Sequence, residues 1–225
     1  MDPKSPNAAL TSLFEAEREV RRAHAELLRC DRAALVATLG QSVKESLALG
    51  DSPEAALRLV RVGDLLGELE GPEAVDLLID VLGGKNAEGR GIAGESLLHI
   101  AFDRFKEVAL GIERALTRLP KDSPALSELP YLIAEVGEPG CVKLIGKFLT
   151  HSDPNVVSSG IEALAEMGDP AAIPLLTPLE KDSRQVDLDE EDAEGRVSLG
   201  ELAHEAVEIL AEIEKKSAPP ARKTR

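Results

Sequence analysis

The sequence predicts an all-α protein, a right-handed α-solenoid of stacked helical hairpins. The first observation is composition: 43% of residues are hydrophobic but only 2% are aromatic, so Leu, Ile, Val and Ala must build the core, as in helical proteins. The second is a motif that recurs about every 33 residues, and the third is the helix-to-helix turn chemistry within each copy.

The motif is a proline followed three residues later by Val or Ile. Clear copies are Pro72 with Val75, Pro139 with Val142, and Pro170 with Ile173. A degenerate fourth copy places Val108 at the equivalent position, with Phe105 in place of the proline. Positions 75, 108, 142 and 173 are 33, 34 and 31 residues apart, which is the period of a solenoid array.

Each copy marks the bend of a helical hairpin. In the last copy, Gly168 ends a helix, Asp169 is an N-cap and Pro170 is a first-turn proline. A second turn follows the same rules, with Asp153 as N-cap and Pro154 as the first residue of the next helix. Two short helices per period cannot bury their apolar faces alone, so neighbouring hairpins must stack.

Residues 153–176 resemble the short HEAT repeat of bacterial proteins, the type also found in phycobilisome-lyase-like proteins. Residues 55–83 and 125–150 resemble it less closely. The resemblance implies a repeat array over residues 51–214 and a surface that binds another protein.

Residues 1–50 are expected to form an N-terminal helical cap on the first repeat, with helices over 7–30 and 31–49. The first helix has one apolar stripe and a solvent face of mixed charge. Its stripe consists of Leu10, Leu13, Phe14, Val20, Leu27 and Leu28. Docking of this helix on a partner helix is the alternative.

The period lengthens near the end of the array. Val207 matches Ile161 of the preceding repeat, 46 residues earlier, and the excess lies in a strongly acidic insertion at 181–196. Insertions in solenoids lie on one face, often the binding face. Residues 215–225 are rich in Pro, Lys and Arg and are expected to be a disordered basic tail.

The charge argues against nucleic acid as a partner. The formal net charge is −15, from 41 acidic and 26 basic residues, and it repels phosphate backbones. No stretch is long and apolar enough to span a membrane, so a cytoplasmic protein is expected. Cys30 and Cys141 lack metal-site or disulfide spacing and are expected to be reduced, mostly buried thiols.

No catalytic, cofactor-binding or metal-binding residues are expected. The four histidines, at 24, 99, 151 and 204, fall in different units without partners at ligand or triad spacing. No phosphate-binding loop or nucleophile elbow is present. The sequence therefore predicts that the protein is not an enzyme and needs no cofactor.

The candidate partner-binding residues follow one line along the second helices of the hairpins. Stepping from Asp76 and Asp80 by one period at a time leads to Ala109 and Glu113, then to Lys143 and Lys147, and finally to Pro174 and Pro178. We expect Asp76, Asp80, Glu113, Lys143 and Lys147 to form an acidic-to-basic gradient that orients an elongated partner. Ordinary solvated faces are the alternative reading.

The leading interpretation is a non-enzymatic adaptor or scaffold that binds another protein through its solenoid surface. One alternative, implied by the resemblance, is an accessory factor that attaches or removes a tetrapyrrole, although the chain has few aromatics to stack on it. Another is binding of duplex DNA, as in HEAT-like glycosylases. That reading requires a basic groove, which this composition does not supply.

Overall fold

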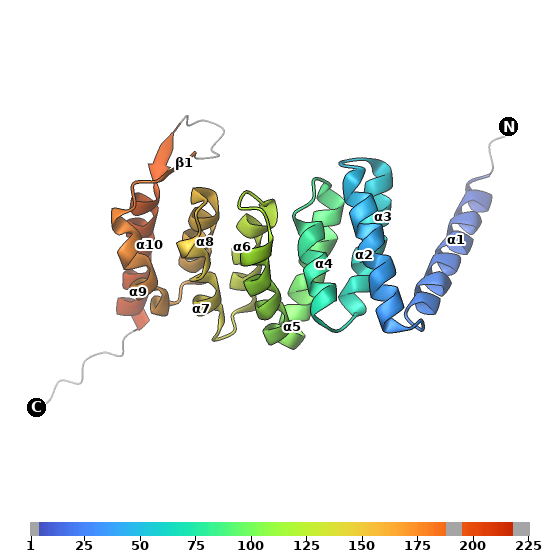
Figure 1. Ribbon diagram of the computed structural model, residues 1–225, viewed down its shortest axis with the longest axis horizontal. Helices are drawn as coiled ribbons and strands as arrows, with labels where there is room; N and C mark the ends of the chain where they lie inside the picture. The colour runs from blue at the N-terminus through green and yellow to red at the C-terminus, as the bar shows by residue number, and fades with distance from the viewer. Residues whose placement is uncertain (1–4, 188–194, 218–225) are drawn as a thin grey trace, which may run out of the picture.

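The protein is an all-α solenoid, as predicted. The computed structural model describes residues 5–187 and 195–217, and it shows helical hairpins standing side by side in a row (Figure 1). Apolar side chains between the hairpins form one continuous core of Leu, Ile, Val and Ala, joined by the buried Phe148.

Two helices, α1 (Pro6–Leu27) and α2 (Arg32–Ala48), precede the repeats. The first helices of the five repeats are α3 (Pro53–Glu68), the first half of α5 (Ala87–Arg118), α6 (Pro124–Val136), α8 (Pro154–Met167) and α10 (Leu199–Ser217). The second helices are α4 (Pro72–Leu82), the second half of α5, α7 (Cys141–Ile145) with η1 (Phe148–Thr150), and α9 (Ile173–Leu176) between η2 (Pro170–Ala172) and η3 (Thr177–Lys181).

The predicted caps form at the predicted residues. The carboxylate of Asp153 accepts a hydrogen bond from the backbone N–H of Asn155, and that of Asp169 accepts one from Ala171. Gly168 ends α8 in the left-handed conformation, with φ of 68°, where glycine is favoured over residues that carry a Cβ. The hairpin bend was therefore read correctly from the sequence.

The degenerate copy has a different bend. Residues 87–118 form one helix interrupted only at Arg104, whose φ of −138° and ψ of 50° are not helical. This copy lacks the glycine and proline that separate the two helices elsewhere, so a kink replaces the turn. Val108, the predicted anchor, is fully buried on the second half of α5.

The second helices become short and irregular toward the C-terminal end of the array. Residues 170–181 pass through two 3₁₀ turns and only one turn of α-helix. Pro170, Pro174 and Pro178 recur every four residues here, and each lacks the N–H that an α-helix would use. This segment is therefore a chain of tight turns in place of a regular helix.

The flanks of the acidic insertion pair as strands, which the sequence analysis missed. Strand β1 (Gln185–Asp187) runs antiparallel to β2 (Arg196–Ser198), with Val186 opposite Val197. Val186 is buried against the core, which fixes the hairpin to the array. Residues 188–194, the middle of the insertion, lie outside the described residues.

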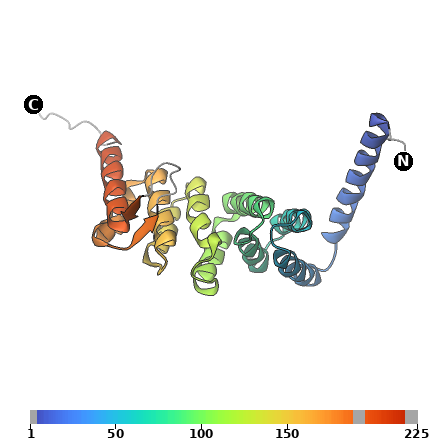
Figure 2. The ribbon, with the colours of Figure 1, turned by 90° about the horizontal axis from the view of Figure 1, so that it is seen from above.

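The helices before the repeats have different roles. Helix α2 packs on the first repeat through Leu35, Leu39 and Val43. Helix α1 has no buried residue and extends away from the row (Figure 2). Both helices were expected to cap the first repeat, but the buried residues that pack on it belong to α2.

Three further expectations can be compared with the structure. Cys141 is buried, but Cys30 is exposed in the turn between α1 and α2, so the prediction of two mostly buried thiols is wrong for Cys30. Helix α10 continues to Ser217, past the predicted start of the tail, and residues 218–225 lie outside the described residues. Over 5–187 and 195–217, no helix combines the length and apolar content needed to cross a membrane.

Candidate functional site

The predicted partner-binding residues all lie on the second helices or directly after them. Asp76 and Asp80 lie on α4, Glu113 on α5, Lys143 on α7, and Lys147 just after α7. We call the surface formed by these side chains and their neighbours the second-helix face.

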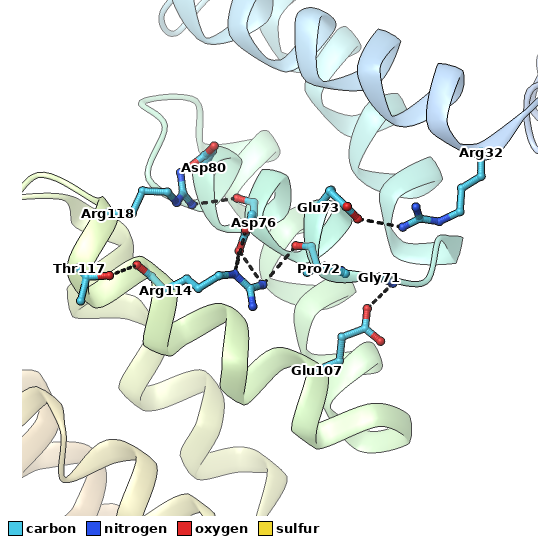
Figure 3. Close-up of polar contacts among 10 residues, drawn as sticks. All are labelled: Arg32, Gly71, Pro72, Glu73, Asp76, Asp80, Glu107, Arg114, Thr117 and Arg118. Carbon is cyan, nitrogen blue, oxygen red and sulfur yellow. Dashed lines mark hydrogen bonds and ion pairs between the residues drawn. The ribbon is translucent and has the colours of Figure 1, made fainter.

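The two aspartates of this face are already paired within the chain. Arg114 donates hydrogen bonds to Asp76 from two nitrogens. Nε lies 3.1 Å from both carboxylate oxygens, and Nη2 lies 2.9 Å from Oδ1 (Figure 3). Arg118 donates to Asp80 at 2.6 Å and to the backbone carbonyl of Asp76 at 3.3 Å. Both arginines come from α5, so these contacts join the first repeat to the second.

Similar pairs continue on both sides. Arg32 of α2 lies 3.1 Å from Glu73 at the start of α4, and Lys147 lies 2.5 Å from Glu113. We call these four cross-helix pairs, Arg32–Glu73, Asp76–Arg114, Asp80–Arg118 and Glu113–Lys147, the inter-repeat ladder. Because its charges are balanced within the chain, the predicted gradient presents far less net charge to a partner than the sequence suggested.

The ladder is only moderately shielded from water. The side chains of Asp76 and Asp80 are 27% and 29% exposed, and their arginines 37% and 39%. Burial raises the pKa of Asp80 above its usual value, and the hydrogen bond from Arg118 opposes that rise. Pairs at this exposure typically contribute about 0–1 kcal/mol each, so the ladder sets the register of stacking more than it stabilises the fold.

Sequence reasoning missed the arginines of the ladder. Arg114 and Arg118 each lie 38 residues after the aspartate they bind. That spacing is one period plus one helical turn. Each arginine lies on the neighbouring second helix, one turn beyond the position equivalent to its aspartate. A search for opposite charges at the period alone does not find it.

Lys143 stands apart from the ladder. Among residues 5–187 and 195–217, no ion pair to Lys143 is present. Lys147, one turn further along, is by contrast paired with Glu113. The two lysines border a groove of about 530 Å³ between α7 and α9. We call it the Lys143 groove; it is lined by Pro139, Val142, Lys143, Gly146, Lys147, Thr150, Ala171, Pro174 and Leu175.

The Lys143 groove combines cations with exposed apolar surface. Leu175 is 39% exposed on one wall, and Gly146 permits its close approach, since a Cβ at that position would lie 2.9 Å from Leu175 Cδ1. A second groove, of about 570 Å³, opens between α2 and α4 beside Asp80, with Val43, Leu47 and Leu77 among its lining residues. The second-helix face therefore offers recesses near both ends of the ladder.

A polar contact on the first helices ties the third repeat to the fourth. The Tyr131 hydroxyl of α6 donates to Glu162 Oε2 on α8, and the Ser158 hydroxyl donates to Oε1 at 2.7 Å. Burial, together with this negatively charged acceptor, raises the pKa of Tyr131 to about 12.

The pKa of Tyr131 gives a direct test of this contact. Tyr131 is the only tyrosine, so the ultraviolet absorbance of tyrosinate reports it alone, and we expect a midpoint about two units above the ordinary ~10. Glu162→Gln should lower that midpoint. Because the unfolded chain ionises first, the contribution of Tyr131 to stability should be lost as pH rises from about 10 to about 12. A wild-type midpoint near 10 while circular dichroism still shows the native helix content would contradict the contact.

No metal centre is evident in the part of the chain that the structure describes, where no three His, Cys, Asp or Glu side chains come together to hold an ion. His24 lies 2.7 Å from Glu68, and His151 accepts the backbone N–H of Asp153 at 3.1 Å, so both have structural partners. The polar groups described above, Lys143 aside, thus form pairs within the chain, and the two grooves on the second-helix face are the recesses beside them.

Comparisons with curated proteins and with solved structures give no match of high similarity. No protein of curated function matches the chain in sequence. Two solved structures are similar in arrangement: an engineered protein at 20% identity, covering 88% of this chain and 92% of its own, and human deoxyhypusine hydroxylase in complex with glycerol at 15%, covering 93% and 100%. Their TM-scores are 0.35 and 0.34, too low to say anything about function.

The family comparison matches part of the array directly. Residues 127–190 match the family described as HEAT repeats, a span that runs from within α6 past β1 and covers the stacked hairpins of the third and fourth repeats. None of these comparisons supports the tetrapyrrole alternative. The stacked hairpins and this match lead to one conclusion: residues 127–190 consist of HEAT repeats, within an all-α solenoid.

Proposed function

We propose that this protein is an adaptor without catalytic activity of its own, which binds an elongated partner protein along the second-helix face. The observation that carries the proposal is the Lys143 groove, where the exposed Leu175 lies beside Lys143, a cation outside the ladder. Apolar contact supplies most of the affinity at a protein interface, and charge supplies orientation.

The groove selects the chemistry of its partner. A segment with an acidic side chain next to an apolar one satisfies both Lys143 and the apolar wall. Asp76, Asp80 and Glu113 contribute differently from Lys143, since their charges are balanced by Arg114, Arg118 and Lys147. These carboxylates and Lys147, which is paired with Glu113, border the path of the partner and fix its register, while Lys143 attracts it.

The test compares proteins captured from native lysate by four forms of the chain, the wild type and three variants. Lys143→Glu reverses the groove cation, and Ala171→Trp fills the groove without changing charge. Lys121→Glu makes the same charge change in the turn after α5, outside the groove. We expect the same partner with the wild type and Lys121→Glu, and about tenfold or greater loss with the other two.

Lys143 and Ala171 are both exposed, so we expect their substitution to leave the fold intact. Circular dichroism verifies this before the capture experiment. If all forms retain the partner equally, the groove is not the binding site. If Ala171→Trp has no effect while Lys143→Glu abolishes capture, the contact is electrostatic alone, and capture by the wild type should then fall steeply with salt.

A further inference from the structure

Helix α1 exposes an apolar face that no part of residues 5–187 and 195–217 covers. Leu10, Leu13 and Phe14 are 48%, 62% and 52% exposed, and Val20 and Leu27 are each 38% exposed. The helix has 22 residues and no buried one. Its C-terminal end is held to α3 by the His24–Glu68 contact at 2.7 Å, while the rest extends away from the array (Figure 2).

Six apolar residues of α1, a set that does not include Leu10 or Phe14, have the spacing of a coiled coil. They recur at alternating steps of four and three residues, which is the seam of a heptad repeat sustained through the helix. The six seam positions are Ala9, Leu13, Ala16, Val20, Ala23 and Leu27. Large side chains alternate strictly with alanines along the seam. Leu13, Val20 and Leu27 therefore protrude at intervals of seven residues, with space beside each alanine between them.

This seam is complementary to itself when two copies run antiparallel. With Val20 of one chain opposite Ala16 of the other, Leu13 lies opposite Ala23, and Leu27 lies opposite Ala9. Every layer then pairs one large side chain with one alanine, the arrangement that lets facing side chains interdigitate. No layer places two large residues together, and the overlap spans the whole seam.

The charges of α1 favour the same orientation. Glu15 and Glu17 precede the midpoint of the seam at Arg18, and the charged residues that follow are Glu19, Arg21, Arg22 and Glu26. Antiparallel pairing in this register brings Glu15 of one helix level with Arg21 of the other, and it also opposes the helix dipoles favourably. Glu19, near the two-fold axis, is neutralised by Arg22 of its own chain at 3.0 Å.

We infer that α1 is a dimerisation helix whose partner is α1 of a second copy of this chain, in an antiparallel two-helix coiled coil. Each helix buries the seam that the isolated chain leaves in water. The inference is independent of the proposed function, because it concerns a different surface. Together they describe a bivalent adaptor with two Lys143 grooves, in which avidity can exceed the affinity of one groove.

The first test measures the mass of the full chain in solution by sedimentation across a range of concentrations. We expect a reversible species of twice the 24.0 kDa chain mass. Leu13→Glu places a charge in the seam and should weaken dimerisation at least about a hundredfold. Ala25→Glu, on the opposite face of the same helix, is the matched control and should leave the dimer intact.

The second test fixes the register by oxidative cross-linking in a Cys30→Ser background. Neither Ala16→Cys nor Val20→Cys alone should cross-link, because neither position faces itself. A mixture of the two single variants should give the mixed disulfide dimer, since these positions face each other in the proposed register.

Three results overturn the inference. The first is a single-chain mass at every concentration, and the second is a dimer that survives Leu13→Glu. The third is efficient cross-linking of Val20→Cys with itself, which indicates parallel helices. Leu13 is 62% exposed, so its replacement leaves the solenoid folded, and a lost dimer cannot be attributed to unfolding.

Discussion

Phe148→Ala is expected to lower the free energy of unfolding by about 3–5 kcal/mol, the usual cost of truncating a fully buried phenylalanine. Phe148 is 0% exposed and is the largest side chain fully buried in the core. It lies on η1, where the second element of the third repeat packs against α8. The truncation would leave a cavity at that junction, which short 3₁₀ turns cannot close by a simple shift.

Denaturant unfolding followed by circular dichroism measures this loss. Phe102→Ala is the matched control, because Phe102 is 57% exposed and its truncation should change stability by no more than about 0.5 kcal/mol. Equal effects of the two substitutions would show that Phe148 does not carry the packing described here.

Gly111→Ala is expected to destabilise the protein by about 2 kcal/mol, although alanine is the better helix former by roughly 1 kcal/mol. A Cβ at residue 111 would lie 2.4 Å from Val75 Cγ1, so α4 and α5 would have to separate. Arg114 lies one turn from Gly111, and Asp76 is next to Val75, so the same separation would stretch the Arg114–Asp76 pair.

Two companion variants make this prediction specific. Gly91→Ala is the same change on the same helix with no atom within 4 Å of the new Cβ, and it should stabilise by up to about 1 kcal/mol. Val75→Ala should remove the clash, so that the double variant with Gly111→Ala is less destabilised than the sum of the single effects. Strict additivity would mean that the two residues do not meet.

The hairpins of this fold could be predicted from sequence because their determinants are local. Asp153 and Asp169 cap the helices that follow them, and Gly168 ends the helix before it. These roles depend on residues within one turn of each other. A period of about 33 residues then implies the stacking, since isolated hairpins cannot bury their apolar faces.

What could not be predicted depends on contacts between repeats. The charges of Asp76 and Asp80 were visible, but their neutralisation by Arg114 and Arg118 required knowing how far one helix is displaced along its neighbour. The position of α1 was missed for the same reason, because an apolar stripe does not indicate which surface covers it. The Lys143 groove arises from the approach of Leu175 to Gly146, two residues 29 positions apart.

The inter-repeat ladder has a mechanical consequence. It couples α2, α4, α5 and the segment after α7, whereas in the described part of the chain no ion pair continues from α7 to the proline-rich turns of α9. Twisting the array about its long axis must stretch the ladder in the first three repeats. At the junction of the third and fourth repeats no ion pair of the described residues resists the twist, and a directional contact there is the hydrogen bond from Tyr131 to Glu162 on the first helices. The second helices are therefore less tightly linked at the Lys143 groove than along the ladder, and a partner bound there can change the angle between them without breaking an ion pair.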